Sequence, residues 1–242
     1  EKIKDNFPFS LTNDQETAII KIVDFIFSPT TDAIFLLKGY AGTGKSTLIG
    51  TLVKTMAQFQ QKTVLLAPTG RAAKVFSSHS NEPAFTIHKK IYRQKGMSDD
   101  GASFSLMDNL YKNTLFIVDE ASMISNQSNE GSFFGTGRLL DDLIEHVYSG
   151  ENCKLLFLGD TAQLPPVKQD ISPAMDVYAL QSFGLDVLES TLTEIMRQAE
   201  ESGILYNATL LRNALSEGTT RLYPKLVLNN FTDVERISGN DL

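Results

Sequence analysis

The sequence predicts an α/β fold in which helices cover both faces of a parallel β-sheet. Short apolar runs recur along the chain without alternating polar and apolar residues, which is typical of strands buried on both faces. Stretches with helical periodicity separate these runs, and strands joined through helices form right-handed crossovers in a parallel sheet. The expected strands are residues 34–37, 64–67, 115–118 and 155–158, and the expected helices are residues 13–27, 46–59, 71–77 and 138–148.

Composition narrows the class of protein. The chain has 242 residues, of which 42% are hydrophobic, which is enough for one substantial core. Its single cysteine excludes an intrachain disulfide framework and favours a reducing compartment. No apolar run approaches the roughly 20 residues that cross a bilayer, and no signal-peptide pattern opens the chain. We therefore expect a soluble protein of the cytoplasm that does not bind membranes.

Two segments interrupt the alternation of strands and helices. Residues 91–109 contain a polar turn between short alternating flanks, which predicts a small inserted hairpin. Residues 125–137 are polar and glycine-rich, which predicts a mobile loop whose two phenylalanines are candidates for contact with a partner. A further strand and a helix follow residue 188. We expect residues 1–188 to form one domain and residues 189–242 to begin a second domain that is incomplete.

A phosphate-binding motif lies between the first expected strand and the next helix. Residues 39–46 read GYAGTGKS and match G-x-x-x-x-G-K-[ST] in the context that the motif requires. The glycines allow backbone N–H groups to converge on phosphate oxygens, and the helix N-terminus adds partial positive charge. Lys45 would neutralise the β- and γ-phosphates, and the Ser46 hydroxyl would bind Mg²⁺. A glycine-rich turn that only caps a helix is the weaker alternative. The expected nucleotide contacts are Gly39, Ala41, Gly42, Thr43, Gly44, Lys45, Ser46 and Thr47.

Two carboxylates follow the third expected strand. Asp119 is predicted to complete the Mg²⁺ site with Ser46, because a carboxylate after an apolar strand holds the metal in proteins with this phosphate-binding motif. Glu120 is then free to take a proton from an attacking water, which makes it the predicted general base. A helix-capping aspartate followed by a solvated glutamate is the alternative. The pair favours hydrolysis over simple storage of a nucleotide.

Six segments appear in a fixed order between residues 11 and 198. They are GYAGTGKST, LLAPTGRAAKVF, FTIHKKI, FIVDEASM, FLGDTAQLPPV and LTEIMRQ. Together they resemble the motor motifs of superfamily 1 DNA helicases, in the 5′-to-3′ branch that includes RecD-like and Dda-like enzymes. The resemblance implies a RecA-like P-loop NTPase fold, ATP with Mg²⁺, and single-stranded DNA and DNA junctions as partners. It also implies that the inserted hairpin is the pin that separates the duplex. Protein partners are not indicated.

The resemblance implies two further residues of the ATP site. Gln163 would be the sensor that hydrogen-bonds the γ-phosphate or the attacking water, since an amide both donates and accepts. An ordinary proline-containing turn is the alternative for this segment. Arg197 would be the first arginine that the second domain directs at the γ-phosphate. A second such arginine has no counterpart before Leu242, so we expect a piece of a longer protein. Two alternatives therefore stay open: a nucleotide-gated module that binds single-stranded DNA with little turnover, or the motor part of a larger nuclease or relaxase.

Thr12 and Gln15 allow two interpretations. They form a capping box ahead of an amphipathic helix, in which each side chain bonds the backbone N–H of the other residue. By resemblance, Gln15 also matches the helicase glutamine that recognises adenine. Both interpretations can hold together.

The charge of the chain is unevenly distributed. The formal net charge is −7, yet residues 69–95 carry six basic side chains and one acid. Such a run is usually a solvated face, and a core histidine is the alternative for His88. By resemblance, this region contacts the DNA backbone, because phosphates need donors and cations while translocation avoids reading bases. The implied DNA contacts are Pro68, Thr69, Arg71, Lys74, Thr86 and His88.

Overall fold

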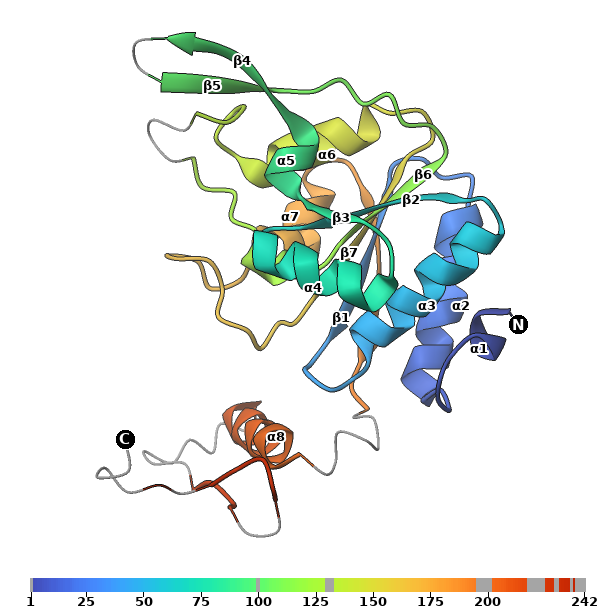
Figure 1. Cartoon of the computed structure of the whole chain (residues 1–242), viewed down its shortest axis with the longest axis vertical. Helices are drawn as coiled ribbons and strands as arrows, with labels where there is room; N and C mark the ends of the chain where they lie inside the picture. The colour runs from blue at the N-terminus through green and yellow to red at the C-terminus, as the bar shows by residue number, and fades with distance from the viewer. Residues whose placement is uncertain are drawn as a thin grey trace.

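The computed structural model describes residues 2–98, 101–128, 133–194, 202–216, 225–228, 231–235 and 237. A six-stranded sheet in the order β3-β2-β6-β7-β1-β8 occupies its centre, and every neighbouring pair is parallel (Figure 1). The predicted α/β fold is therefore confirmed, and each expected strand lies within a strand of the sheet. The strands are β1 (Ala33–Gly39), β2 (Lys62–Ala67), β3 (Ala84–Thr86), β6 (Thr114–Val118), β7 (Lys154–Gly159) and β8 (Asp186–Leu192).

The two faces of the sheet belong to two separate apolar cores. In β1, Phe35 and Leu37 pack into one core, whereas Ile34 and Leu36 pack into the other, and all four side chains are fully buried. Burial on both faces explains why the strand sequences do not alternate. The first core is covered by α1 (Lys2–Asp5), α2 (Asn13–Phe27), α3 (Lys45–Gln58) and α4 (Gly70–Ser80), and the second by α5 (Ile87–Ile91), α6 (Leu139–Tyr148) and α7 (Val177–Gln181).

A hairpin extends from one end of the sheet, as the sequence predicts. β4 (Tyr92–Ser98) and β5 (Gly101–Leu106) pair in antiparallel fashion within the expected range of 91–109 (Figure 1). The hairpin follows α5 directly. Its position therefore depends on how α5 and the first residues of β4 pack against the sheet.

The end of the 125–137 loop packs against this hairpin, while residues 129–132 lie outside the described residues. The Phe134 ring stacks on Phe104 with their centroids 4.5 Å apart. Asp142, which is buried in α6, accepts hydrogen bonds from the Tyr92 hydroxyl at 2.6 Å and from the Thr136 N–H at 3.0 Å. One of the two phenylalanines that we expected to contact a partner thus contacts the chain's own hairpin.

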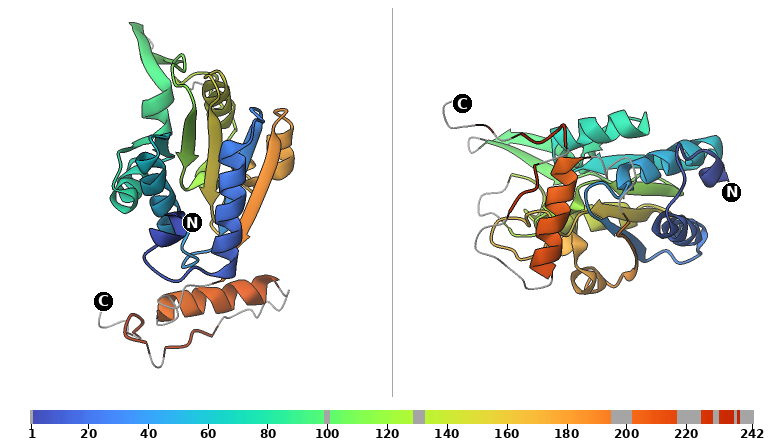
Figure 2. Two further views of the ribbon diagram at one scale, coloured as in Figure 1. Left: turned by 90° about the vertical axis from the view of Figure 1, so that its right-hand side faces the viewer. Right: turned by 90° about the horizontal axis from the view of Figure 1, so that it is seen from below.

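The domain boundary that we expected after residue 188 is wrong. β8 runs through it and pairs with β1 along its whole length, so residues 189–192 belong to the first sheet. The strand end is fixed to α2, because the N–H and hydroxyl groups of Thr193 both donate to Asp14 at 2.7 Å. The next described element, α8 (Gly203–Ser216), lies below the carboxyl ends of the strands (Figures 1 and 2). That α8 begins a second RecA-like domain stays a prediction.

In the described part of the chain, no helix is both long and apolar enough to span a membrane.

Candidate active site

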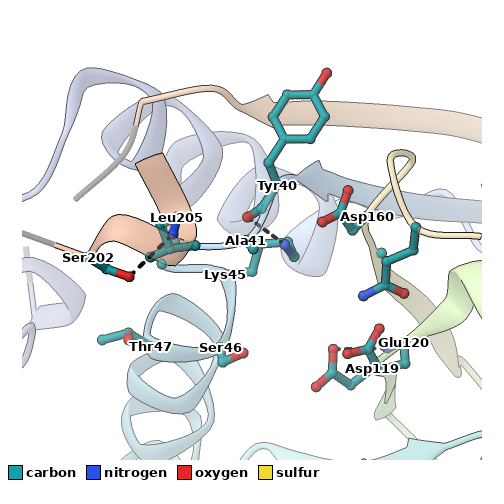
Figure 3. A pocket seen from close by; sticks show the side chains of 14 residues that line it. Tyr40, Ala41, Lys45, Ser46, Thr47, Asp119, Glu120, Asp160, Ser202 and Leu205 are labelled. Carbon is teal, nitrogen blue, oxygen red and sulfur yellow. Dashed lines mark hydrogen bonds between the residues drawn. The ribbon is translucent and has the colours of Figure 1, made fainter. Parts of the chain in front are cut away.

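The carboxyl ends of β1, β6 and β7 surround one hollow of about 530 Å³ (Figure 3). Neighbouring parallel strands place their following loops at the same edge of the sheet, so the phosphate-binding motif, the carboxylate pair and Gln163 come together there. Two predicted site residues, Gly39 and Thr43, are buried within the phosphate-binding loop and do not line the hollow. A third, Arg197, lies outside the described residues. The hollow is lined by Tyr40, Ala41, Gly42, Gly44, Lys45, Ser46, Thr47, Asp119, Glu120, Gly159, Asp160, Gln163, Ser202 and Leu205.

The glycines of the phosphate-binding loop are required by its backbone. Gly42 and Gly44 both have φ of 81°, in the left-handed region that favours glycine. A Cβ at Gly39 would lie 2.8 Å from the Thr43 hydroxyl, so the loop has no room for a side chain there. Gly44 is the N-cap residue of α3, and it has no side chain that could accept hydrogen bonds from the first N–H groups of the helix. The first N–H groups of α3 are therefore directed at the hollow, which is the arrangement of a helix N-terminal anion site.

The Lys45 ammonium lies inside the curl of the loop. Its Nζ donates to the carbonyl oxygens of Gly39 at 2.6 Å and Tyr40 at 2.9 Å. Burial lowers the pKa of Lys45, and the negative charges of Asp160, Asp119 and Glu120 oppose that shift. Phosphate oxygens are charged acceptors and bind an ammonium more strongly than neutral carbonyls do. Lys45 is thus positioned to change from loop carbonyls to a phosphate.

Gln15 forms the predicted capping box and also contacts the phosphate-binding loop. Its Oε1 accepts from the Thr12 N–H at 3.1 Å, and its own N–H donates to the Thr12 hydroxyl at 3.3 Å. The Gln15 amide donates to the Thr43 carbonyl at 3.0 Å, and the side chain is fully buried. The amide therefore connects the start of α2 to the loop. Recognition of adenine by Gln15 stays a prediction.

The carboxylate pair is held in an unusual backbone conformation. Glu120 has φ of 55°, which costs a non-glycine residue on the order of 1–3 kcal/mol and is found mainly at functional sites. Asp119 accepts a hydrogen bond from the Glu120 N–H at 2.9 Å. Burial and the charge of Glu120 raise the pKa of Asp119 to about 6, while that hydrogen bond and Lys45 act in the opposite direction. The charge of Glu120 is thus close enough to favour the protonated form of Asp119.

The donor atoms around the hollow fit Mg²⁺ bound together with a nucleotide. The described residues contain no cluster of three or more His, Cys, Asp or Glu side chains that could hold a metal by themselves. Ser46 and Asp119 nevertheless both line the hollow and offer oxygen donors. Mg²⁺ typically takes one or two protein ligands and completes its shell with phosphate oxygens and water. This donor set therefore suits a metal that arrives with its nucleotide.

Gln163 is connected to the carboxylate loop through a residue that sequence reasoning missed. The Ser122 hydroxyl, two residues after Glu120, donates to Gln163 Oε1 at 2.9 Å. Asp160 was also missed, although it stands directly after β7 in the GDTAQ segment. It is buried and accepts from the Ala162 N–H at 2.8 Å, which shapes the turn that carries Gln163. The sensor candidate is thus hydrogen-bonded to the loop that carries the base candidate.

A second hollow, of about 500 Å³, lies between α4 and the edge strand β3. It brings together Lys74, Thr86 and Lys89, and it lies beside Thr69 at the start of α4. The hydroxyl oxygens of Thr69 and Thr86 accept the N–H groups that begin α4 and α5, both at 3.2 Å. A hydroxyl that accepts with its oxygen can still donate its own hydrogen. Arg71 is exposed on the first turn of α4 but does not line this hollow.

His88 lies in an aromatic cluster. Its ring is 5.1 Å from Phe134 in an edge-on arrangement and 5.7 Å from Tyr92. Burial lowers the pKa of His88, so the ring is neutral at pH 7. This geometry favours the structural alternative for His88. A phosphate contact by His88 stays a prediction.

The chain resembles known proteins over most of its length. A family model described as an AAA domain matches residues 10–225. The ATP-dependent RecD2 DNA helicase of Deinococcus radiodurans is 28% identical over 209 residues, which is 85% of this chain and 25% of that protein. An uncharacterized protein of Methanocaldococcus jannaschii is 29% identical over 184 residues, which is 71% of this chain and 15% of that protein. The crystal structure of the Pif1 helicase of Candida albicans has 21% identity and a TM-score of 0.48, covering 85% of this chain and 44% of that one.

The match to the RecD2 helicase confirms the resemblance to RecD-like helicases that the ordered motifs indicate. The chain spans 25% or less of the length of the two curated relatives.

Proposed function

The chain belongs to the AAA domain family, and we propose from this premise that it is the ATP-hydrolysing motor domain of a RecD-like DNA helicase. At the coarser level, the chain is a helicase-like P-loop NTPase domain related to RecD2. The finer proposal is that it uses ATP hydrolysis to translocate on single-stranded DNA in the cytoplasm. In its full-length context it would help to unwind duplex DNA at junctions.

One observation carries the proposal: the phosphate-binding loop, the carboxylate pair and Gln163 line a single hollow. The N–H groups of the loop and Lys45 would hold the phosphates, because they present donors and positive charge at the N-terminus of α3. Ser46 and Asp119 would hold Mg²⁺, which supplies a Lewis acid for the phosphate oxygens. Glu120 would take the proton from water, and Gln163 would orient that water.

The DNA path that we propose runs over α4 and the edge strand β3. Lys74 and Lys89 provide cations there, and Thr69 and Thr86 provide hydroxyl hydrogens for phosphates. Such contacts hold a backbone without reading its bases, which suits translocation. The path ends near the β4–β5 hairpin, because α5 connects β3 directly to β4. This connection supports the proposal that the hairpin separates the two strands of the DNA duplex.

A phosphate-release assay with and without single-stranded DNA tests the proposal. Glu120→Gln keeps size and hydrogen bonding but loses basicity, so turnover should fall roughly 100-fold or more while ATP still binds. Glu145→Ala, on the exposed side of α6, is the matched control and should retain wild-type turnover. Unchanged turnover in Glu120→Gln would assign the base elsewhere.

The same assay separates the alternatives. A wild-type protein that binds ATP and single-stranded DNA, yet releases no phosphate with both present, would be the nucleotide-gated binding module. Lys45→Ala should weaken ATP binding, because the P-loop N–H groups would then hold the phosphates without the ammonium. Equal ATP affinity for Lys45→Ala and wild type would contradict the nucleotide site itself.

A further inference from the structure

The side-chain charge around the nucleotide hollow is unbalanced. Among the described residues that line it, Lys45 is the only basic side chain, whereas Asp119, Glu120 and Asp160 are acidic. A triphosphate brings more negative charge than one divalent cation neutralises. Transfer of a phosphoryl group spreads that charge over the γ-phosphate oxygens, where cations stabilise it. The described lining therefore leaves a place for a further cation beside the γ-phosphate, in addition to the Arg197 that the resemblance implies.

Arg212, on α8, lies on the side of the loop where such a cation is needed. Its guanidinium carbon is 3.8 Å from the centroid of the Tyr40 ring, and Tyr40 is part of the phosphate-binding loop. Arg212 lines a hollow of about 610 Å³ that shares Tyr40, Ala41, Asp160 and Gln163 with the nucleotide hollow. Because Gln163 marks the γ-phosphate end of the proposed site, Arg212 stands beside that end.

The position of α8 holds Arg212 near the loop. Ser202 and Leu205, at the start of α8, line the nucleotide hollow itself, and Figure 3 shows them beside Ala41. Leu211 and Arg212, about two turns further along, line the adjoining hollow. The helix therefore passes along the loop, and Arg212 lies in a hollow that adjoins the nucleotide hollow.

The contact that now holds the guanidinium is weaker than the one that a phosphate offers. Among the described residues, no carboxylate forms an ion pair with Arg212. A cation–π contact is easily exchanged for paired, charge-assisted hydrogen bonds to phosphate oxygens. An arriving γ-phosphate would thus take the guanidinium from the ring.

We propose that Arg212 is a phosphate-binding residue that lies on the Tyr40 ring in the free protein and binds the γ-phosphate of a nucleoside triphosphate. Tyr40 is then a positioning residue that keeps the guanidinium beside the loop. This inference rests on the proposed function of the hollow as an ATP site. It makes Arg212 a determinant of the preference for triphosphate over diphosphate, a role carried by this chain's own α8.

The test compares the affinities of ADP and a non-hydrolysable ATP analogue by calorimetry. Loss of charge-assisted hydrogen bonds in Arg212→Met should weaken analogue binding roughly 10- to 100-fold. ADP, which has no γ-phosphate, should bind within about 3-fold of wild type. Methionine keeps an unbranched apolar side chain at this position of α8, so the thermal unfolding temperature should stay unchanged. Arg212→Lys should be intermediate, because lysine cannot bind bidentately.

Tyr40 and a remote arginine provide the controls. Tyr40→Leu, which removes the ring beneath the guanidinium, should weaken analogue binding by about 3-fold. Arg138→Ala, an exposed residue at the start of α6, should change neither affinity. If Arg212→Met leaves the ratio of the two affinities unchanged, Arg212 only holds α8 and the inference is overturned. Lys45→Ala distinguishes that outcome from a failure of the proposed function. As long as Lys45→Ala weakens the binding of both nucleotides, the assignment of the hollow as an ATP site stands.

Discussion

Replacing Gln15 should reveal that a buried amide holds the phosphate-binding loop in place. The Gln15 side chain is fully buried and bonds at both ends, to the Thr12 N–H at 3.1 Å and the Thr43 carbonyl at 3.0 Å. Gln15→Ala removes both bonds at once. Water can reach Thr12, which is partly exposed, but Thr43 is fully buried and its carbonyl would lose its amide partner.

The magnitude follows from these two losses. A buried acceptor without a partner costs about 1–3 kcal/mol, and losing half of a capping box adds about 0.5–1 kcal/mol. We therefore expect the free energy of unfolding to fall by about 1.5–4 kcal/mol. For a chain of this length, that change corresponds to a melting temperature lower by roughly 3–16 °C.

Urea denaturation measures this loss, with Gln61→Ala as the matched control. Gln61 also donates its amide to a backbone carbonyl, that of Asn113 at 2.6 Å, but at the surface. Its removal should cost about 0.5 kcal/mol or less. If Gln15 only holds the loop, the ATP and GTP affinities of Gln15→Ala should fall in the same proportion, because the loop that binds both triphosphates is disturbed. If Gln15→Ala lowers the affinity for ATP but not for GTP, and leaves the free energy of unfolding unchanged, this reasoning is refuted. Gln15 would then be the adenine-recognising residue.

Three further variants and one control address the DNA side and the hairpin. Gln163→Ala should leave ATP and DNA affinities nearly unchanged when each is measured alone, but it should remove the shift in DNA affinity between ADP and a non-hydrolysable ATP analogue, a coupling of about 1–3 kcal/mol. Changing Arg71 and Lys74 together to alanine should lower the slope of log affinity against log salt by about 1.4, because roughly 0.7 is lost for each phosphate contact on a single strand. Lys62→Ala, an exposed lysine at the amino-terminal start of β2, should leave that slope unchanged. Asp142→Ala should cost about 2–5 kcal/mol in urea unfolding, because it leaves buried donors unpaired at the base of the hairpin. ATPase activity without DNA should stay at the wild-type level, and a stability loss below about 0.5 kcal/mol would show that Asp142 does not hold the hairpin.

The central part of the fold could be predicted because the sequence signals for its strands are local. Each of the four central strands combines continuous apolar residues with burial on both faces, and each is followed by polar residues that could be recognised as a motif. The chemistry after β1 and β6 was readable for the same reason. A glycine-rich loop and a carboxylate pair need particular residue types at fixed spacing, whatever the rest of the chain does.

Features that depend on long-range packing could not be predicted from local sequence patterns. β8 belongs to the first sheet because it pairs with β1, yet as an edge strand it exposes Leu188 and Glu189 and has no continuous apolar run. β3 spans only Ala84–Thr86, too few residues for any periodicity. The bond from Gln15 to the loop joins residues 28 positions apart, and only the packing of α2 against the sheet brings them together. Side-chain directions of this kind follow from the assembled fold.

The strand order explains how one nucleotide could be sensed by two separate segments. β1, which carries the phosphate-binding loop, lies between β7 and β8. The chain leaving β7 presents Gln163 to the hollow, and the chain that follows β8 leads to α8 and Arg212. These three strands are paired in register, with Lys38 opposite both Gly159 and Thr191. A slip by one residue would turn buried side chains of β1 and β7 to the opposite face, so the strands cannot shift when a phosphate is lost. The segments left to respond to the γ-phosphate would therefore be the Gln163 turn and α8, which reach the hollow from the two neighbours of β1.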